Sequence, residues 1–148
     1  MSNAQAVALE GGQWPKEHDQ LRGKADVVFV DAPCSGIGAL RRNPEARWRL
    51  READLATFSA RQREILISAT PLLAPGGRLV YGTCTLLAIE NREVVEATLA
   101  AKPELTNVPL REVLGDRAAT LGVDELSFTV APDLHGTDGF YARVLRRT

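Results

Sequence analysis

The sequence has few of the residues that build disulfide frameworks, metal sites or membrane spans. Among its 148 residues are two cysteines and two histidines, and Cys34 and Cys84 stand far apart without CxxC spacing. This pattern argues against a disulfide scaffold and a structural zinc site, so we predict no metal. There is also no apolar run of about 18 residues and no secretion signal. We therefore expect a cytoplasmic protein without membrane contact.

An excess of charge of either sign is also absent. The formal net charge is -1 and the pI is about 6.1, which excludes the global positive field typical of many nucleic-acid-binding proteins. Any nucleic-acid contact must use a local patch. The hydrophobic fraction of 45% and charged fraction of 25% are ordinary for a folded domain.

The chain instead shows alternating strand and helix patterns. A short β-branched run bounded by charge at 26–31 is typical of a strand buried on both faces of a parallel sheet. Apolar residues at three- and four-residue intervals from 55 to 73 predict a helix that ends before Pro75. The further predicted elements are a strand at 78–83, a helix at 89–101, strands at 105–110, 126–130 and 139–146, and a short strand around Val7.

This β-α-β-α order predicts an α/β fold with right-handed crossovers. The strand ends at Asp31 and Thr83 should then lie at one edge of the sheet, where ligands bind in open α/β folds. One cysteine follows each end, Cys34 after the first and Cys84 after the second. A lone cysteine is more often a small buried hydrophobe, but two at neighbouring strand ends indicate a site.

Two segments carry a resemblance to a known family. Residues 31–38 read Asp-Ala-Pro-Cys-Ser-Gly-Ile-Gly, and Arg-Arg-Asn-Pro-Glu at 41–45 and then Trp48 follow. Thr-Cys-Thr at 83–85 precedes Glu-Asn at 90–91. In order and spacing these segments resemble two signatures of the RNA cytosine-5 methyltransferases, in particular the bacterial ribosomal RNA enzymes. Residues 136–141, with the arginines after them, resemble the family's closing strand more weakly.

The resemblance implies a partial Rossmann-like methyltransferase fold. Its sheet would be mostly parallel, with an antiparallel carboxyl-terminal strand pair and with the first strands missing. Residues 1–23 would be a tag remnant and irregular lead-in, and residues 24–148 the carboxyl-terminal part of the catalytic domain. An exposed edge on the strand at 26–30 would favour a homodimer that pairs or covers it.

The S-adenosyl-L-methionine site is expected to be incomplete. Such enzymes hold this cofactor with a glycine-rich loop, which has no counterpart ahead of Asp26, and Gly12 stands where family members usually place an acidic cofactor ligand. The resemblance therefore implies either a cloned fragment or a natural truncation.

The implied activity is transfer of a methyl group to carbon 5 of cytosine in RNA, ribosomal by its subgroup. Cys84 would be the nucleophile, Cys34 would assist release of the methylated RNA, and Asp31 would face both the base and the cofactor. The opposite assignment stays open, because Pro33-Cys34 resembles the nucleophile loop of DNA cytosine methyltransferases.

The remaining candidates concern the substrate. Pro33, Ser35 and Gly36 would shape a substrate loop. Arg41 and Arg42 are the best candidates for RNA contact within a cluster that continues through Arg47, Arg49 and Arg51, although a solvated helix face would look the same. We expect Trp48 to pack in the core and Asp138 to cap a turn. No catalytic role is predicted for Asp138, His18 or His135.

Two other classes of function compete with an active methyltransferase. One is a non-catalytic RNA-binding module that kept the substrate half of the site. The other is a cysteine hydrolase, which is disfavoured because neither histidine follows a strand end opposite Cys84.

Overall fold

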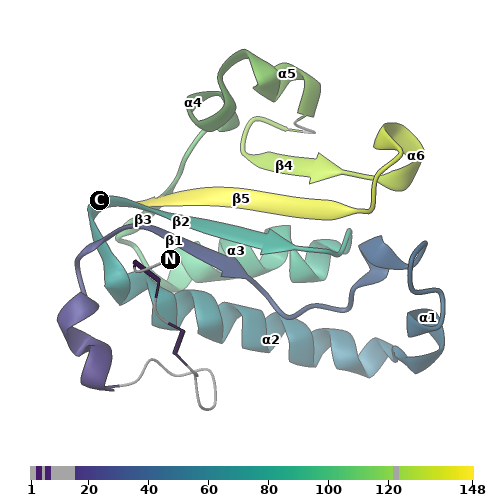
Figure 1. Cartoon of the computed structure of the whole chain (residues 1–148), viewed down its shortest axis with the longest axis horizontal. Coiled ribbons are helices and arrows are strands. Elements are labelled where there is room, and N and C mark those ends of the chain that lie inside the picture. The colour runs from purple at the N-terminus through teal and green to yellow at the C-terminus, as the bar shows by residue number, and fades with distance from the viewer. Residues whose placement is uncertain (1–2, 5, 8–15, 122–123) are drawn as a thin grey trace.

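The computed structural model describes residues 3–4, 6–7, 16–121 and 124–148. Five strands and several helices alternate along the chain (Figure 1). The strands are β1 (Ala25–Asp31), β2 (Leu73–Thr83), β3 (Leu105–Asn107), β4 (Ser127–Val130) and β5 (Phe140–Arg147). The α-helices are α1 (Ala46–Arg49), α2 (Glu52–Ala69), α3 (Arg92–Ala101), α4 (Leu110–Leu114), α5 (Ala118–Leu121) and α6 (Pro132–His135). The 3-10 turns are η2 (Lys16–Leu21), η3 (Ile37–Ala39), η4 (Thr70–Leu72), η5 (Ala88–Glu90) and η6 (Gly115–Arg117).

The strands form one sheet in the order β1-β2-β5-β3, with β4 also beside β5. β1 and β2 are parallel, whereas β5 is antiparallel to β2, β3 and β4. Strands β1 to β4 therefore run in one direction and β5 alone runs against them. The predicted α/β class, with mostly parallel strand directions and antiparallel pairing at the carboxyl-terminal end, is confirmed.

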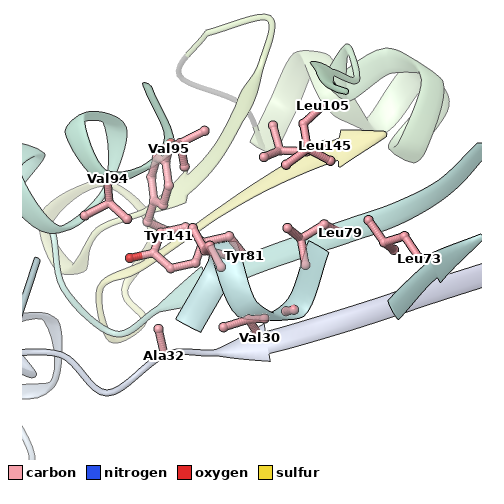
Figure 2. Close-up of a cluster of buried hydrophobic side chains, with 12 residues drawn as sticks. Val30, Ala32, Leu73, Leu79, Tyr81, Val94, Val95, Leu105, Tyr141 and Leu145 are labelled. Atoms are coloured by element: carbon pink, nitrogen blue, oxygen red, sulfur yellow. The ribbon is translucent and has the colours of Figure 1, made fainter. Parts of the chain in front are cut away.

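Helices α2 and α3 cover one face of the sheet and enclose the core (Figure 1). Tyr81 and Leu79 of β2 alternate with residues of the opposite face, as the two-residue period of a strand requires. Figure 2 shows side chains from β1, β2, α3 and β5 meeting on this face, among them Val30, Val95 and Leu145. Each such side chain contributes about 1.5–3 kcal/mol when fully buried.

The predicted helices and strands exist, and their bounds differ for local reasons. β2 begins at Leu73 rather than at 78, because Ala25 pairs with Leu73 and the extra residues 74–77 of β2 form an irregularity before the regular pairing starts at Arg78. The second long helix begins at Arg92 rather than at 89, because residues 88–90 form the turn η5. That turn directs the side chain of Glu90 into the protein interior, where it is fully buried.

The prediction that the strand at 26–31 is buried on both faces is wrong. β1 lies at the edge of the sheet, and Val27 and Phe29 are 60% and 59% exposed. Val30 faces the covered side, whereas Phe29 lies over Gly82 on the other side. The edge position expected for this strand is confirmed.

Two further predictions concern the lead-in and membranes. A short strand was predicted around Val7, but Ala6 and Val7 do not belong to a strand. Residues 8–15, which follow them, lie outside the described residues. Within the described ranges, no helix has both the length and the apolar character needed to cross a membrane.

Candidate active site at the ends of β1 and β2

The two cysteines meet at the carboxyl-terminal ends of the parallel strands. Cys34 Sγ lies 3.3 Å from Cys84 Sγ. The pairing of β1 with β2 continues one residue past the strand, since Ala32 N donates to Gly82 O at 3.0 Å. The two loops therefore leave the sheet side by side, as the parallel strand order predicts.

A buried carboxyl group ties these two loops together. Glu90 has an exposed fraction of 0%, and its Oε1 accepts a hydrogen bond from Ser35 N at 2.8 Å. Ser35 Oγ donates to Glu90 Oε2 and lies 3.1 Å from Thr85 Oγ1. Ser35, predicted as part of a substrate loop, thus connects the Cys34 loop to the Cys84 loop.

Gln62 of α2 completes this connection and was not predicted. Its Nε2 donates to Glu90 Oε1 at 3.0 Å and to Pro33 O at 2.9 Å. The side chain is 0% exposed. Its position in the sequence could have indicated this role, because Gln62 is a polar residue on the apolar stripe of the helix, between Phe58 and Leu66.

Side chains around Glu90 also hold the turn that carries Cys84. Tyr81 OH donates to Glu90 O at 2.5 Å. Asn91 Nδ2 donates to Thr85 O at 2.9 Å, and Thr83 Oγ1 donates to Asn91 Oδ1 at 2.6 Å. The Glu-Asn pair of the second sequence signature is therefore structural support for the cysteine turn.

Two glycines allow the loops to approach closely. Gly38 N donates to Cys84 O at 2.9 Å, and Gly139 N donates to Gly38 O at 2.8 Å. A Cβ atom on Gly38 would lie 2.8 Å from Cys84 O, closer than real Cβ atoms come. Gly36 has φ of 71°, a left-handed conformation that glycine adopts without strain.

The surroundings of Cys34 favour its protonated form. Burial, together with the hydrogen bond to Cys84, raises the pKa of Cys34 to about 12. Cys34 therefore keeps its proton at neutral pH and can donate S–H to the sulfur of Cys84.

Asp31 stands exposed at the end of β1, next to the Cys34 loop. It borders a groove of about 390 Å³ whose walls also include Phe29, Pro33 and Arg61. The structure thus brings Asp31, Pro33, Cys34 and Ser35 together in one loop, with Cys84 across from it.

The arginine cluster lies beyond the cysteine loop and is partly paired. Arg42 Nε is 2.7 Å from Asp138 Oδ2, and an Arg41 NH2 nitrogen is 3.4 Å from Asp138 Oδ1. Asp138 therefore pairs with these arginines instead of capping a turn, which corrects the prediction. The ion pairs hold the cluster against the segment before β5.

The prediction that Trp48 packs in the core is also wrong. Its side chain is 77% exposed, and the Arg47 guanidinium lies 4.4 Å from the ring centroid. His135 accepts a hydrogen bond from Ala131 N on the exposed helix α6, and the side chain of His18 lies outside the described residues. Within the described part of the chain, no group of three or more histidine, cysteine or acidic residues is placed so that it could hold a metal ion.

The fold places the chain in the class of Rossmann-like methyltransferase folds. The solved structure titled "Crystal Structure of PH0851" superposes with a TM-score of 0.75 at 39% identity, over 85% of this chain and 27% of that chain. NSun6 from Pyrococcus horikoshii, solved with SFG, superposes with a TM-score of 0.62 at 28% identity, over 80% of this chain and 29% of that chain.

The family model described as 16S rRNA methyltransferase RsmB/F matches residues 2–146, and the chain belongs to this family. Ribosomal RNA small subunit methyltransferase F of Cronobacter sakazakii (strain ATCC BAA-894) is 39% identical over 83% of this chain and 26% of its own length. The chain spans about a third or less of the length of such curated relatives.

Proposed function

We propose that this chain carries the substrate half of an active site that methylates carbon 5 of a cytosine in RNA, with ribosomal RNA as the substrate class. The observation that carries the proposal is the pair of thiols 3.3 Å apart at the ends of β1 and β2. Membership of the RsmB/F family and the ribosomal RNA named for its relatives support the choice of substrate.

The chemistry of cytosine explains the need for a thiol. Carbon 5 is a poor nucleophile until another nucleophile adds at carbon 6, so the enzyme forms a temporary covalent bond to the base. The base must first leave its stack to reach the two loops. We assign the attack to the sulfur of Cys84, which returns as the leaving group once carbon 5 has lost its proton to a base.

The raised pKa of Cys34 supports this assignment. Attack by Cys34 would require loss of a proton that its pKa of about 12 retains. A protonated Cys34 beside Cys84 suits a hydrogen-bond donor, and its S–H would stabilise the Cys84 sulfur as it leaves at the end of the reaction. Asp31, exposed beside the same loop, suits a hydrogen bond to the base.

The residues beside β1 fit one part of S-adenosyl-L-methionine. The carboxylate of Asp31 would pair with positive charge on the cofactor, and Phe29 offers an apolar wall of the adjoining groove. When bound, the cofactor supplies the methyl group. The chain spans about a third or less of the length of its curated relatives, so we expect weaker binding by this chain alone than by the chimera described below. That a neighbour was solved with SFG, an analogue of this cofactor, supports the choice.

The test compares this chain with a chimera in which the preceding segment of the Cronobacter sakazakii enzyme is fused ahead of Lys24. Cofactor binding is measured by calorimetry and methyl transfer on cytosine-containing RNA. We expect the chimera to bind and methylate, and Cys84→Ala to abolish transfer. Cys34→Ala should instead accumulate a covalent protein–RNA adduct on denaturing gels. A covalent adduct that forms in Cys84→Ala but not in Cys34→Ala would assign the attack to Cys34.

A second candidate is a non-catalytic RNA-binding module. The observation that favours it is the cluster of five arginines at 41–51, which can contact RNA without any catalytic step. A chimera that binds RNA but neither binds the cofactor nor transfers a methyl group would support this function over the enzyme.

A further inference from the structure

Trp48 has the highest exposed fraction of the large apolar side chains in the described residues, 77%. A tryptophan buries about 150–250 Å² in a typical core or interface, so leaving this ring in water forgoes a large amount of hydrophobic stabilisation. It stands on α1, which lies beyond the end of the sheet toward which β1 and β2 run (Figure 1). The cysteine loops leave the sheet at this same end.

The segment that carries Trp48 is held at both ends. Before α1, Arg42 pairs with Asp138 at 2.7 Å. After α1, Arg51 N donates to Asp54 Oδ2 at 2.9 Å, which joins the segment to the start of α2. The exposed ring is therefore carried by a segment with a polar contact on each side of α1.

The charge around the ring is complementary to a polyanion. Residues 41–51 contain five arginines and a single acidic residue, Glu45, in a chain whose net charge is -1. Arg47 lies over one face of the ring, with its guanidinium carbon 4.4 Å from the ring centroid, and the tryptophan is still 77% exposed. Arginine planes and aromatic rings are the surfaces on which unpaired RNA bases stack.

A hollow connects this segment to the cysteine site. It measures about 330 Å³ and is lined by Ser35 on one side and by Asn43, Arg49 and Phe58 on the others. Ser35 is the residue after Cys34 and is bonded to Glu90. The hollow therefore borders both the Cys34 loop and the segment that carries Trp48.

We propose that Trp48 and Arg47 form a stacking platform for an unpaired RNA base that flanks the target cytosine. That the stacked base belongs to RNA rests on the proposed function. The ring supplies the stacking surface, Arg47 orients it and contacts the adjacent phosphate, and Arg49 lines the path from the platform to the thiols.

Tryptophan fluorescence tests the platform without the cofactor or turnover. The chain has two tryptophans, so a Trp14→Phe background leaves Trp48 as the sole emitter. A short single-stranded oligocytidylate should quench this emission, whereas an abasic strand of the same length and inorganic polyphosphate should not. Quenching by the abasic strand, or none by the oligocytidylate, would overturn the platform.

Affinity measurements on variants separate stacking from charge. Trp48→Ala should weaken oligocytidylate binding about 5- to 100-fold, and Trp48→Phe by less than about fivefold. Arg47→Lys should keep the salt dependence of binding. Arg47→Ala should reduce the slope of the logarithm of the binding constant against the logarithm of the salt concentration by about one. Arg117→Ala, an exposed arginine on η6, is the matched control. Equal affinity of Trp48→Ala and the parent would contradict the proposal.

The two proposals fail separately. Base-dependent quenching without methyl transfer by the chimera would keep the platform and reject the enzyme. Methyl transfer by a Trp48→Ala chimera with unchanged RNA affinity would keep the enzyme and reject the platform.

Discussion

At the scale of single residues, the site depends on a buried carboxyl group that is satisfied entirely by neutral donors. Glu90 accepts hydrogen bonds from Ser35 N, Ser35 Oγ and Gln62 Nε2. A buried donor left without its acceptor costs about 1–3 kcal/mol. The cost of losing Glu90 should therefore exceed that of an ordinary core substitution.

Two substitutions of Glu90 separate hydrogen bonding from packing. Glu90→Leu leaves these donors without an acceptor and should lower the free energy of unfolding by about 3–5 kcal/mol. Glu90→Gln keeps an oxygen toward Ser35 N and Gln62, and its amide can donate to Ser35 Oγ, whose own proton can turn to Thr85 Oγ1. It should cost less than about 1 kcal/mol. Urea unfolding measures both, and equal losses would contradict this account.

At the scale of elements, the loops after β1 and β2 and the segment before β5 are joined through backbone contacts. Gly38 donates to Cys84 O and accepts from Gly139 N. This arrangement leaves no room for a side chain at Gly38. The backbone of one cysteine loop thereby positions the other.

Gly38→Ala should separate these loops. Its Cβ would collide with the backbone oxygens of Cys84 and Gly139, which cannot rotate away, and we expect a loss of about 2–4 kcal/mol in the free energy of unfolding. Gly36→Asn is the matched control, because nothing lies within 4 Å of its Cβ position and asparagine tolerates positive φ. Thermal unfolding of both variants checks the difference, and a stable Gly38→Ala protein would refute it.

The edge strand β1 is a second feature at this scale. It pairs with β2 on one side, and its exposed Val27 and Phe29 give it an apolar surface. Such an edge is a template for pairing with another strand. A homodimer through β1 stays a prediction for this chain in isolation.

Sedimentation velocity tests the dimer. The chain should sediment as a concentration-dependent dimer, and Phe29→Lys should shift it to monomer by placing a charge on the exposed face. Val113→Lys adds the same charge at another exposed position, on α4, and should leave the dimer intact. A monomer at all concentrations would exclude pairing through this edge.

At the scale of the whole molecule, burial holds several weak acids in their protonated forms. The pKa of Cys34 is raised to about 12 by burial, and burial also raises the pKa values of Tyr81 and Tyr141. Each group keeps its proton in the folded chain at a pH where the unfolded chain has released it. Their contribution to stability is therefore complete below about pH 9 and is lost as the pH rises further.

The melting temperature should consequently be flat from about pH 7 to pH 8.5 and should fall between about pH 9 and pH 11. Circular dichroism melts at stepped pH values measure this. Cys34→Ser removes one of the responsible groups and should make the alkaline decline shallower. A melting temperature that stays constant to pH 11 would show that these groups titrate alike in the folded and unfolded chains.

Local sequence patterns determined the elements and the meeting of the cysteines. The β-branched runs and helical periodicity predicted β1, α2, β2 and α3 because side-chain spacing alone sets which face of each element is apolar. The parallel order then required the ends of β1 and β2 to lie together. The sequence therefore predicted that Cys34 and Cys84 lie near each other. Signature residues between 31 and 91 added the family.

Only the tertiary structure decided how surfaces and distant polar groups are used. The apolar run of β1 reads the same whether one or two layers cover it, so the exposure of Phe29 depends on elements elsewhere in the chain. The exposure of Trp48 could not be predicted either, because a large ring is equally apolar in the core and on the surface. The bonds of Gln62 to Glu90 and of Arg42 to Asp138 join residues far apart in sequence. No local pattern specifies such partners, since they meet only when the sheet and helices close around them.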